Sequence, residues 1–187
     1  MSTFEKITAI TNIVIAAAAV VTFLLVYWQL AETKESAHLD QRAWVSTFGI
    51  GGNFPEADKE FHAPIKFKNS GKTFAKNVKV NWHIRTLPKQ QAPNFDKEAS
   101  ATGGETTRSV GLLPPNGEYT IDAASEAADQ IGVNKIKSGE YRVFIFGEIT
   151  YEDIFNCPHW TNFCYVLTTN GTFEIWEAHN DADDNHC

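Results

Sequence analysis

The stretch Tyr141–Tyr151, "YRVFIFGEITY", decides the fold class because its middle is apolar on both faces. Successive side chains of a β-strand point to opposite faces of its sheet, so a strand that is half exposed alternates between apolar and polar residues. A run without this alternation indicates a strand that is covered on both sides. We therefore predict that residues 141–151 form a central strand.

The chain on either side of this strand, from Ala43 onward, consists of short apolar runs separated by Gly, Pro, Asn and Asp. This pattern favours an immunoglobulin-like antiparallel β-sandwich and leaves room for only one short helical turn, within residues 125–136. The fold class is thus mainly β, with an N-terminal transmembrane helix. The expected strands are Trp44–Ile50, Phe61–Lys68, Asn77–Leu87, Thr107–Leu112, Tyr119–Asp122, Tyr141–Tyr151, Phe163–Thr169 and Thr172–Glu177.

Two turns support the strand assignment. Asn170-Gly171 lies between two strand-like runs, and these are the preferred residues of a two-residue type I′ hairpin, whose central positions both need positive φ. Asn69–Gly71 forms an earlier turn, after which Val78, Val80 and Trp82 alternate with polar residues. This second pattern predicts a half-buried strand.

The N-terminal region contains 25 consecutive residues without a charge, from position 7 to position 31. About 20 helical residues cross a hydrocarbon core of roughly 30 Å, so this run is long enough for a transmembrane helix. Tyr27 and Trp28 occupy the position of a membrane-interface belt. A cleaved signal peptide is disfavoured because the apolar run is too long. In addition, the one cleavage-like sequence, "QLA", has the bulky Gln29 at the −3 position, where a small residue is required. We expect a retained anchor that continues as a helical stalk to Asp40.

The predicted organisation has three parts: anchor and stalk at 1–42, β-sandwich at 43–178, and a solvated acidic tail at 179–187. The net charge is −7, and no Lys or Arg follows Arg142. Nucleic-acid backbones require clustered basic residues, so nucleic acid is excluded as a partner. No catalytic or phosphate-binding motif is present, so we expect neither an enzyme nor a cofactor.

The loop expected at 152–162 contains the densest group of reactive side chains. Asp153, Cys157, His159 and Cys164 are zinc-ligand types, although the paired spacing of structural zinc sites is missing. Cys157 and Cys164 are alternatively candidates for a disulfide. We favour a third interpretation, in which the loop is architectural, its aromatic rings enter the core, and its thiols are free.

Several motifs carry a resemblance to known proteins. The segment "NSGKTFAKNV" resembles the immunoglobulin-like modules of bacterial envelope proteins, of which the CARDB type is the nearest. Together with "QRAWV", "GEITYEDIF" and "HWTNFC", it resembles a set of short single-pass bacterial membrane proteins of uncharacterised function. The resemblance implies a protein of the bacterial inner membrane with a cytoplasmic domain. The odd number of cysteines points to the same side, because thiols stay reduced in the cytoplasm.

These observations lead to one expected function and one alternative. We expect a membrane-anchored, non-enzymatic protein-binding module, serving as an accessory or self-associating subunit of a membrane complex. Its expected partners are the lipid bilayer, through residues 7–30, and another membrane or membrane-associated protein or a second copy of itself. The alternative is a metal- or redox-responsive domain that uses the loop from Cys157 to Cys164.

Overall fold

The structure, a computed structural model, describes residues 3–95 and 107–183 and contains two compact units that divide between Gln41 and Arg42. The first unit is the helix α1 (Thr3–Gln41), which continues without a break from the uncharged run into the expected stalk. The predicted helix is therefore confirmed. In the described residues, however, no helix meets the length and apolarity required of a membrane span. The predicted transmembrane role of α1 is thus not supported by the structure.

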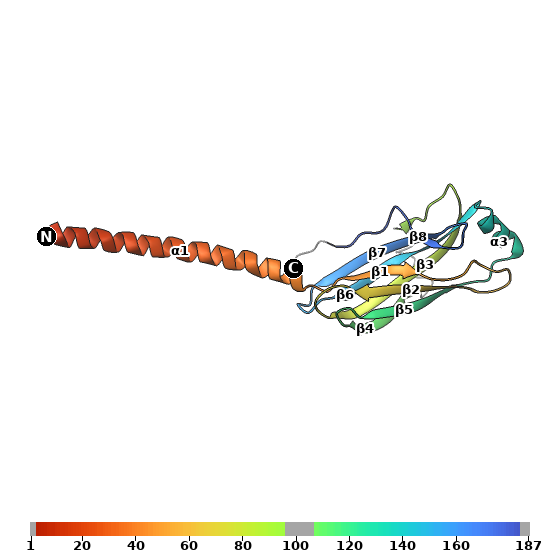
Figure 1. Ribbon diagram of the computed structural model, residues 1–187, viewed down its shortest axis with the longest axis horizontal. Helices are drawn as coiled ribbons and strands as arrows, with labels where there is room; N and C mark the ends of the chain where they lie inside the picture. Colours follow the sequence, from red (N-terminus) through yellow and green to blue (C-terminus); the bar gives the residue numbers. More distant parts are fainter. Residues whose placement is uncertain (1–2, 96–106, 184–187) are drawn as a thin grey trace. The chain divides into compact units, whose positions relative to one another are not determined.

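The second unit contains two antiparallel sheets, as the strand pattern predicted (Figure 1). The three-stranded sheet has the order β1-β2-β5, and the five-stranded sheet has the order β4-β3-β6-β7-β8. A short helix, α3 (Gln130–Lys137), leads into β6 and is capped by the Asp129 side chain, which accepts a hydrogen bond from the Gly132 N–H. The strands are β1 (Val45–Ile50), β2 (Phe61–Asn69), β3 (Ala75–Pro88), β4 (Thr107–Leu113), β5 (Glu118–Ser125), β6 (Tyr141–Glu152), β7 (Pro158–Leu167) and β8 (Phe173–Ile175).

Strand β6 is the central strand of the five-stranded sheet, which confirms the prediction from its apolar run. It pairs with β3 on one side and with β7 on the other, and residues 143–147 are all buried. Gly147 permits the close approach of β3, because a Cβ at this position would collide with the backbone of Asn81. Glycine is therefore needed where the two strands meet.

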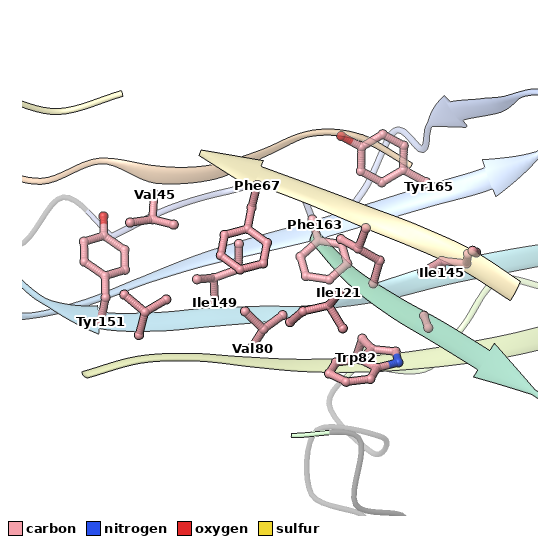
Figure 2. Packing of buried hydrophobic residues seen from close by; sticks show 14 of the residues in the cluster. Val45, Phe67, Val80, Trp82, Ile121, Ile145, Ile149, Tyr151, Phe163 and Tyr165 are labelled. Carbon is pink, nitrogen blue, oxygen red and sulfur yellow. The ribbon is translucent and has the colours of Figure 1, made fainter. Parts of the chain in front are cut away.

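The main core lies between the two sheets. Phe67 and Ile121 extend from the three-stranded sheet, and Val80 and Phe163 extend from the five-stranded sheet into the same buried cluster (Figure 2). The alternation predicted for β3 is confirmed, since Val78, Val80 and Trp82 are all buried.

Two details of the strands differ from the expectation. Strand β7 begins at Pro158 rather than Phe163, so the expected 152–162 loop is only a short corner. The β7–β8 connection is not a type I′ turn, because only Gly171 has positive φ. The Thr168 N–H instead bonds the Thr172 carbonyl oxygen, which produces a wider connection.

The C-terminal segment is part of the sandwich at least to Asp183, rather than a solvated tail. The Trp176 N–H bonds the Cys164 carbonyl oxygen at 2.9 Å, and the Asp183 N–H bonds the Trp160 carbonyl oxygen at 3.1 Å. Residues 176–183 thus run along the edge of β7 as an irregular continuation of β8. This segment satisfies backbone groups that an edge strand would otherwise expose.

A matched pair of substitutions tests the core. Phe67 is fully buried, whereas Phe48 on β1 is 52% exposed. Phe67→Ala should reduce the free energy of unfolding by about 3–5 kcal/mol because it leaves a cavity, and Phe48→Ala by about 1 kcal/mol or less. Denaturant unfolding of the fragment 42–187 measures both values. Equal losses would contradict the arrangement of the two sheets.

Candidate functional site

Asp153 shapes the corner between β6 and β7. Its Oδ1 atom accepts hydrogen bonds from the N–H groups of Phe155, at 2.8 Å, and Cys157, at 3.0 Å. Asn156 adopts a φ of +67°, a conformation that asparagine tolerates better than most residues. The carboxylate therefore holds the turn that brings the chain back into β7.

The same carboxylate belongs to a line of buried charged side chains, which we call the buried charge cluster: Arg42, Asp153, His159 and Asp183. Arg42 Nη2 lies 2.7 Å from Asp183 Oδ1, and His159 Nδ1 lies 2.9 Å from Asp183 Oδ2. His159 Nε2 lies 3.3 Å from Asp153 Oδ2. All four side chains are at most 4% exposed. The cluster is thus shielded from water.

The geometry of the cluster favours balanced charges. Both ring nitrogens of His159 face carboxylate oxygens, and both can donate only when the ring carries two protons. In that form the two cations and the two carboxylates cancel, as buried charges require. Burial raises the pKa of Asp183, but the hydrogen bonds from His159 and the Trp160 N–H, together with the charge of Arg42, outweigh it and lower the pKa below its ordinary value.

The cluster joins three segments that are distant in the sequence. Arg42 is the first residue of the sandwich unit, His159 points inward from β7, and Asp183 belongs to the C-terminal segment. Sequence reasoning identified Asp153 and His159 but missed Arg42 and Asp183, which are 141 positions apart. The cluster has no open access to water, so its arrangement is suited to a structural connection rather than to chemistry on a ligand.

The structure does not pair the two cysteines that were candidates for a disulfide. Cys164 is free and buried, whereas Cys157 is disulfide-bonded, so the free-thiol interpretation is also wrong for Cys157. Seven residues of strand separate the two positions by roughly 23 Å, far more than the roughly 4–7 Å between the Cα atoms of a disulfide. The third cysteine, Cys187, lies outside the described residues.

The structure also does not bring the four candidate zinc ligands together as a metal site. Burial raises the pKa of the Cys164 thiol to about 12, and its side chain packs against Phe144 and Phe146. A protonated thiol in an apolar environment is a poor metal ligand. In the residues that the structure describes, no group of three or more His, Cys, Asp or Glu side chains could hold a metal ion. Asp153 and His159 do lie together, but they bond each other.

The two residues expected at a membrane interface are on α1. Tyr27 and Trp28 are both well exposed on this helix. Their exposure is compatible with the expected role and leaves it a prediction.

A separate pocket of about 220 Å³ lies on the outer face of the five-stranded sheet, the face turned away from the main core. We call it the outer-face pocket. Sequence reasoning missed it because its residues come from three strands and from two segments outside the strands, and only the tertiary structure brings them together. Its lining residues are Asn81, His83, Phe95, Phe146, Gly147, Glu148, Asn162 and His179.

Replacement of Asp183 tests the buried charge cluster. Asp183→Asn leaves Arg42 buried without its counter-charge and should cost about 3–5 kcal/mol at neutral pH. Because the pKa of Asp183 is lowered on folding, its stabilisation exists above the unfolded pKa and is lost as the pH falls through the folded pKa. The difference between wild type and variant should therefore shrink in acid.

The control for this experiment is Asp181→Asn, which makes the same chemical change at an exposed position of the same segment. Denaturant unfolding from neutral to acidic pH gives all three stabilities. The charge of Asp183 would not stabilise the fold if the difference in unfolding free energy between wild type and Asp183→Asn stayed the same at every pH. The same conclusion would follow if Asp181→Asn lost as much stability as Asp183→Asn.

Comparisons with known proteins give one family match. No curated protein matches the chain. The solved structure "X-ray structure of Northeast Structural Genomics Consortium target SoR45" is 15% identical, with 75% of this chain and 95% of that chain covered and a TM-score of 0.32. The comparisons do not support the CARDB-type resemblance. A family model described as "Domain of unknown function (DUF8453)" matches residues 7–170, which include most of α1 and every strand except β8. The chain therefore belongs to the DUF8453 family.

Proposed function

We propose that this is a single-pass membrane protein whose immunoglobulin-like β-sandwich binds another membrane or membrane-associated protein, or a second copy of itself, without catalysing a reaction. The observation that carries the proposal is the uncharged run at 7–31, which is helical throughout. The strand order β1-β2-β5 facing β4-β3-β6-β7 supports an immunoglobulin-like module.

The exposure of α1 supports the anchor. Between Val14 and Leu30, the large apolar side chains are all more than half exposed, and Phe23 is 70% exposed. In water this would be a large apolar patch, which soluble monomers rarely carry. A hydrocarbon environment around residues 7–30 removes that cost, and Tyr27 and Trp28 then lie near the headgroups.

The edge strand β4 is the proposed contact for the protein partner. Within the described residues β4 pairs only with β3, and Leu112 is 57% exposed on it. An edge strand offers backbone N–H and carbonyl groups to an added strand, while exposed apolar side chains contribute burial. On the opposite side of the same sheet, residues 176–183 cover the part of β7 that β8 leaves unpaired, and β8 itself has only three residues.

The disulfide bond of Cys157 changes the proposed side of the membrane on which the sandwich lies. Disulfides form and persist in oxidising compartments, so the bonded state of Cys157 supports the non-cytoplasmic side, opposite to the initial expectation. The alternative function, a metal- or redox-responsive loop from Cys157 to Cys164, has less support, because Cys164 is buried and its raised pKa keeps it protonated.

Extraction and proteolysis test the anchor and its orientation. The full chain should remain in the membrane pellet after alkaline carbonate treatment, and protease added to spheroplasts should digest the sandwich. Val20→Arg combined with Leu24→Arg should release the protein, because each central arginine costs about 2.5–3.5 kcal/mol. Thr33→Arg, in the stalk, is the matched control and should stay in the pellet. Release of the wild type by carbonate would exclude the anchor, and a protected sandwich would reverse the orientation.

A surface substitution tests the partner contact. Leu112→Glu should reduce co-purification of a partner, or the mass of the self-associated species, in mild detergent, because it places a charge at the proposed interface. Ile175→Glu is the control, since Ile175 is 68% exposed on β8 at the other edge of the sheet. Light scattering coupled to size exclusion measures the mass, and equal behaviour of both variants would exclude β4 as the contact.

A further inference from the structure

The outer-face pocket is built on a regular strand register. Asn81 on β3 is the cross-strand partner of Glu148 on β6, and Glu148 is the partner of Asn162 on β7. Three adjacent strands therefore place an amide, a carboxylate and a second amide in one row on the outer face. In the next row His83 stands opposite Phe146. The floor of the pocket thus has one charged group, with an amide on each side and aromatic rings beside it.

The walls come from two segments outside the strands. Phe95 precedes β4 in the chain, and its ring stacks on that of His179, with centroids 4.3 Å apart and planes 3° from parallel. Phe95 also meets Phe146 edge-on, with centroids 5.3 Å apart. His179 has a φ of +60°, which is uncommon for a non-glycine residue and costs free energy. The surrounding contacts hold this residue against Phe95 despite that cost.

Among the described residues that line the pocket, Glu148 is the only Asp, Glu, Lys or Arg. It forms no hydrogen bond or ion pair within the described part of the chain, although Lys79 and Arg85 lie on the same face of β3. The Glu148 side chain is exposed to solvent, yet the partial burial of the carboxyl group raises its pKa. A partly desolvated carboxylate without a partner is stabilised by any cation that reaches it.

We propose that the outer-face pocket binds an alkylammonium group, either of a small free amine or of a lysine side chain presented by another protein. The ammonium N–H groups would donate to the Glu148 carboxylate and to the oxygens of the flanking amides, Asn81 and Asn162. The rings of Phe95 and Phe146 would supply apolar contact for the alkyl stem and cation–π attraction for the charge. This inference goes beyond the proposed function and does not depend on the anchor or on β4.

The chemistry of the pocket disfavours other ligands. An anion would be repelled by Glu148, and the Asp181 carboxylate, which accepts a hydrogen bond from the Asn162 side chain, adds further negative charge nearby. The volume of about 220 Å³ is below the roughly 300–1,000 Å³ of drug-sized sites, so only a short chain fits. A neutral alcohol of the same length would lack the attraction to the carboxylate.

A ligand series tests this proposal on the full chain in detergent micelles. Backbone amide signals of residues 148 and 162 are followed by NMR during titration with n-butylammonium, with n-butanol and with butyrate. We expect saturable shifts with n-butylammonium alone. Glu148→Gln, which keeps the shape and removes the charge, should weaken binding about tenfold or more. Glu174→Gln on β8, an exposed carboxylate outside the pocket, is the control and should bind like the wild type.

The source of the ammonium group is distinguished by a second ligand, the amide of Nα-acetyl-lysine. Tighter binding of this compound than of n-butylammonium would identify a lysine side chain of a protein, and weaker binding would identify a free amine. The proposal is overturned if n-butanol binds as well as n-butylammonium, if no ligand produces a saturable shift, or if Glu148→Gln binds n-butylammonium as well as the wild type.

Discussion

The ion pair between Arg42 and Asp183 is the interaction on which the ends of the sandwich depend. Two fully buried charges repay their loss of hydration only when the geometry is good and further hydrogen bonds are present. His159 and the Trp160 N–H supply those bonds to Asp183, and Asp153 holds the other side of His159. The start of the domain, one strand corner and the C-terminal segment are thereby joined, and none of the three can move without leaving a buried charge unpaired.

Much of the sandwich could be predicted from the sequence, because its strands follow simple apolar patterns. The unbroken apolar run of β6 and the alternation of Val78, Val80 and Trp82 each reflect a local rule that needs no knowledge of the rest of the fold. The start of β7 could not be predicted in this way. His159 and Thr161 point toward the core, so the inward face of the first half of this strand is polar. From the sequence alone this part resembles a loop, because the carboxylates that pair with His159 lie elsewhere in the chain.

The candidate sites, too, could be predicted only as far as local sequence patterns define them. Asp153 and His159 were recognised as reactive residue types, but their partners are set by tertiary structure, and that structure makes them an internal support instead of a metal site. Cys157 and Cys164 are close in the sequence yet separated by the extended geometry of a strand. The outer-face pocket depends on register, since Asn81, Glu148 and Asn162 form a row only when three strands align as they do. No single segment carries that information.

The C-terminal segment also limits how the five-stranded sheet can grow. Residues 176–183 cover the part of β7 that β8 leaves unpaired, so β4, with seven residues, offers a longer open edge than β8, with three. Two copies that join through β4 about a twofold axis would form one continuous ten-stranded sheet and use the open edge of each. Such an assembly is closed at two chains, whereas a sheet with both edges free can polymerise. In such a pair, the residues that follow β8 would shorten the edge that remains open, and they would thereby disfavour further extension of the sheet into a fibre.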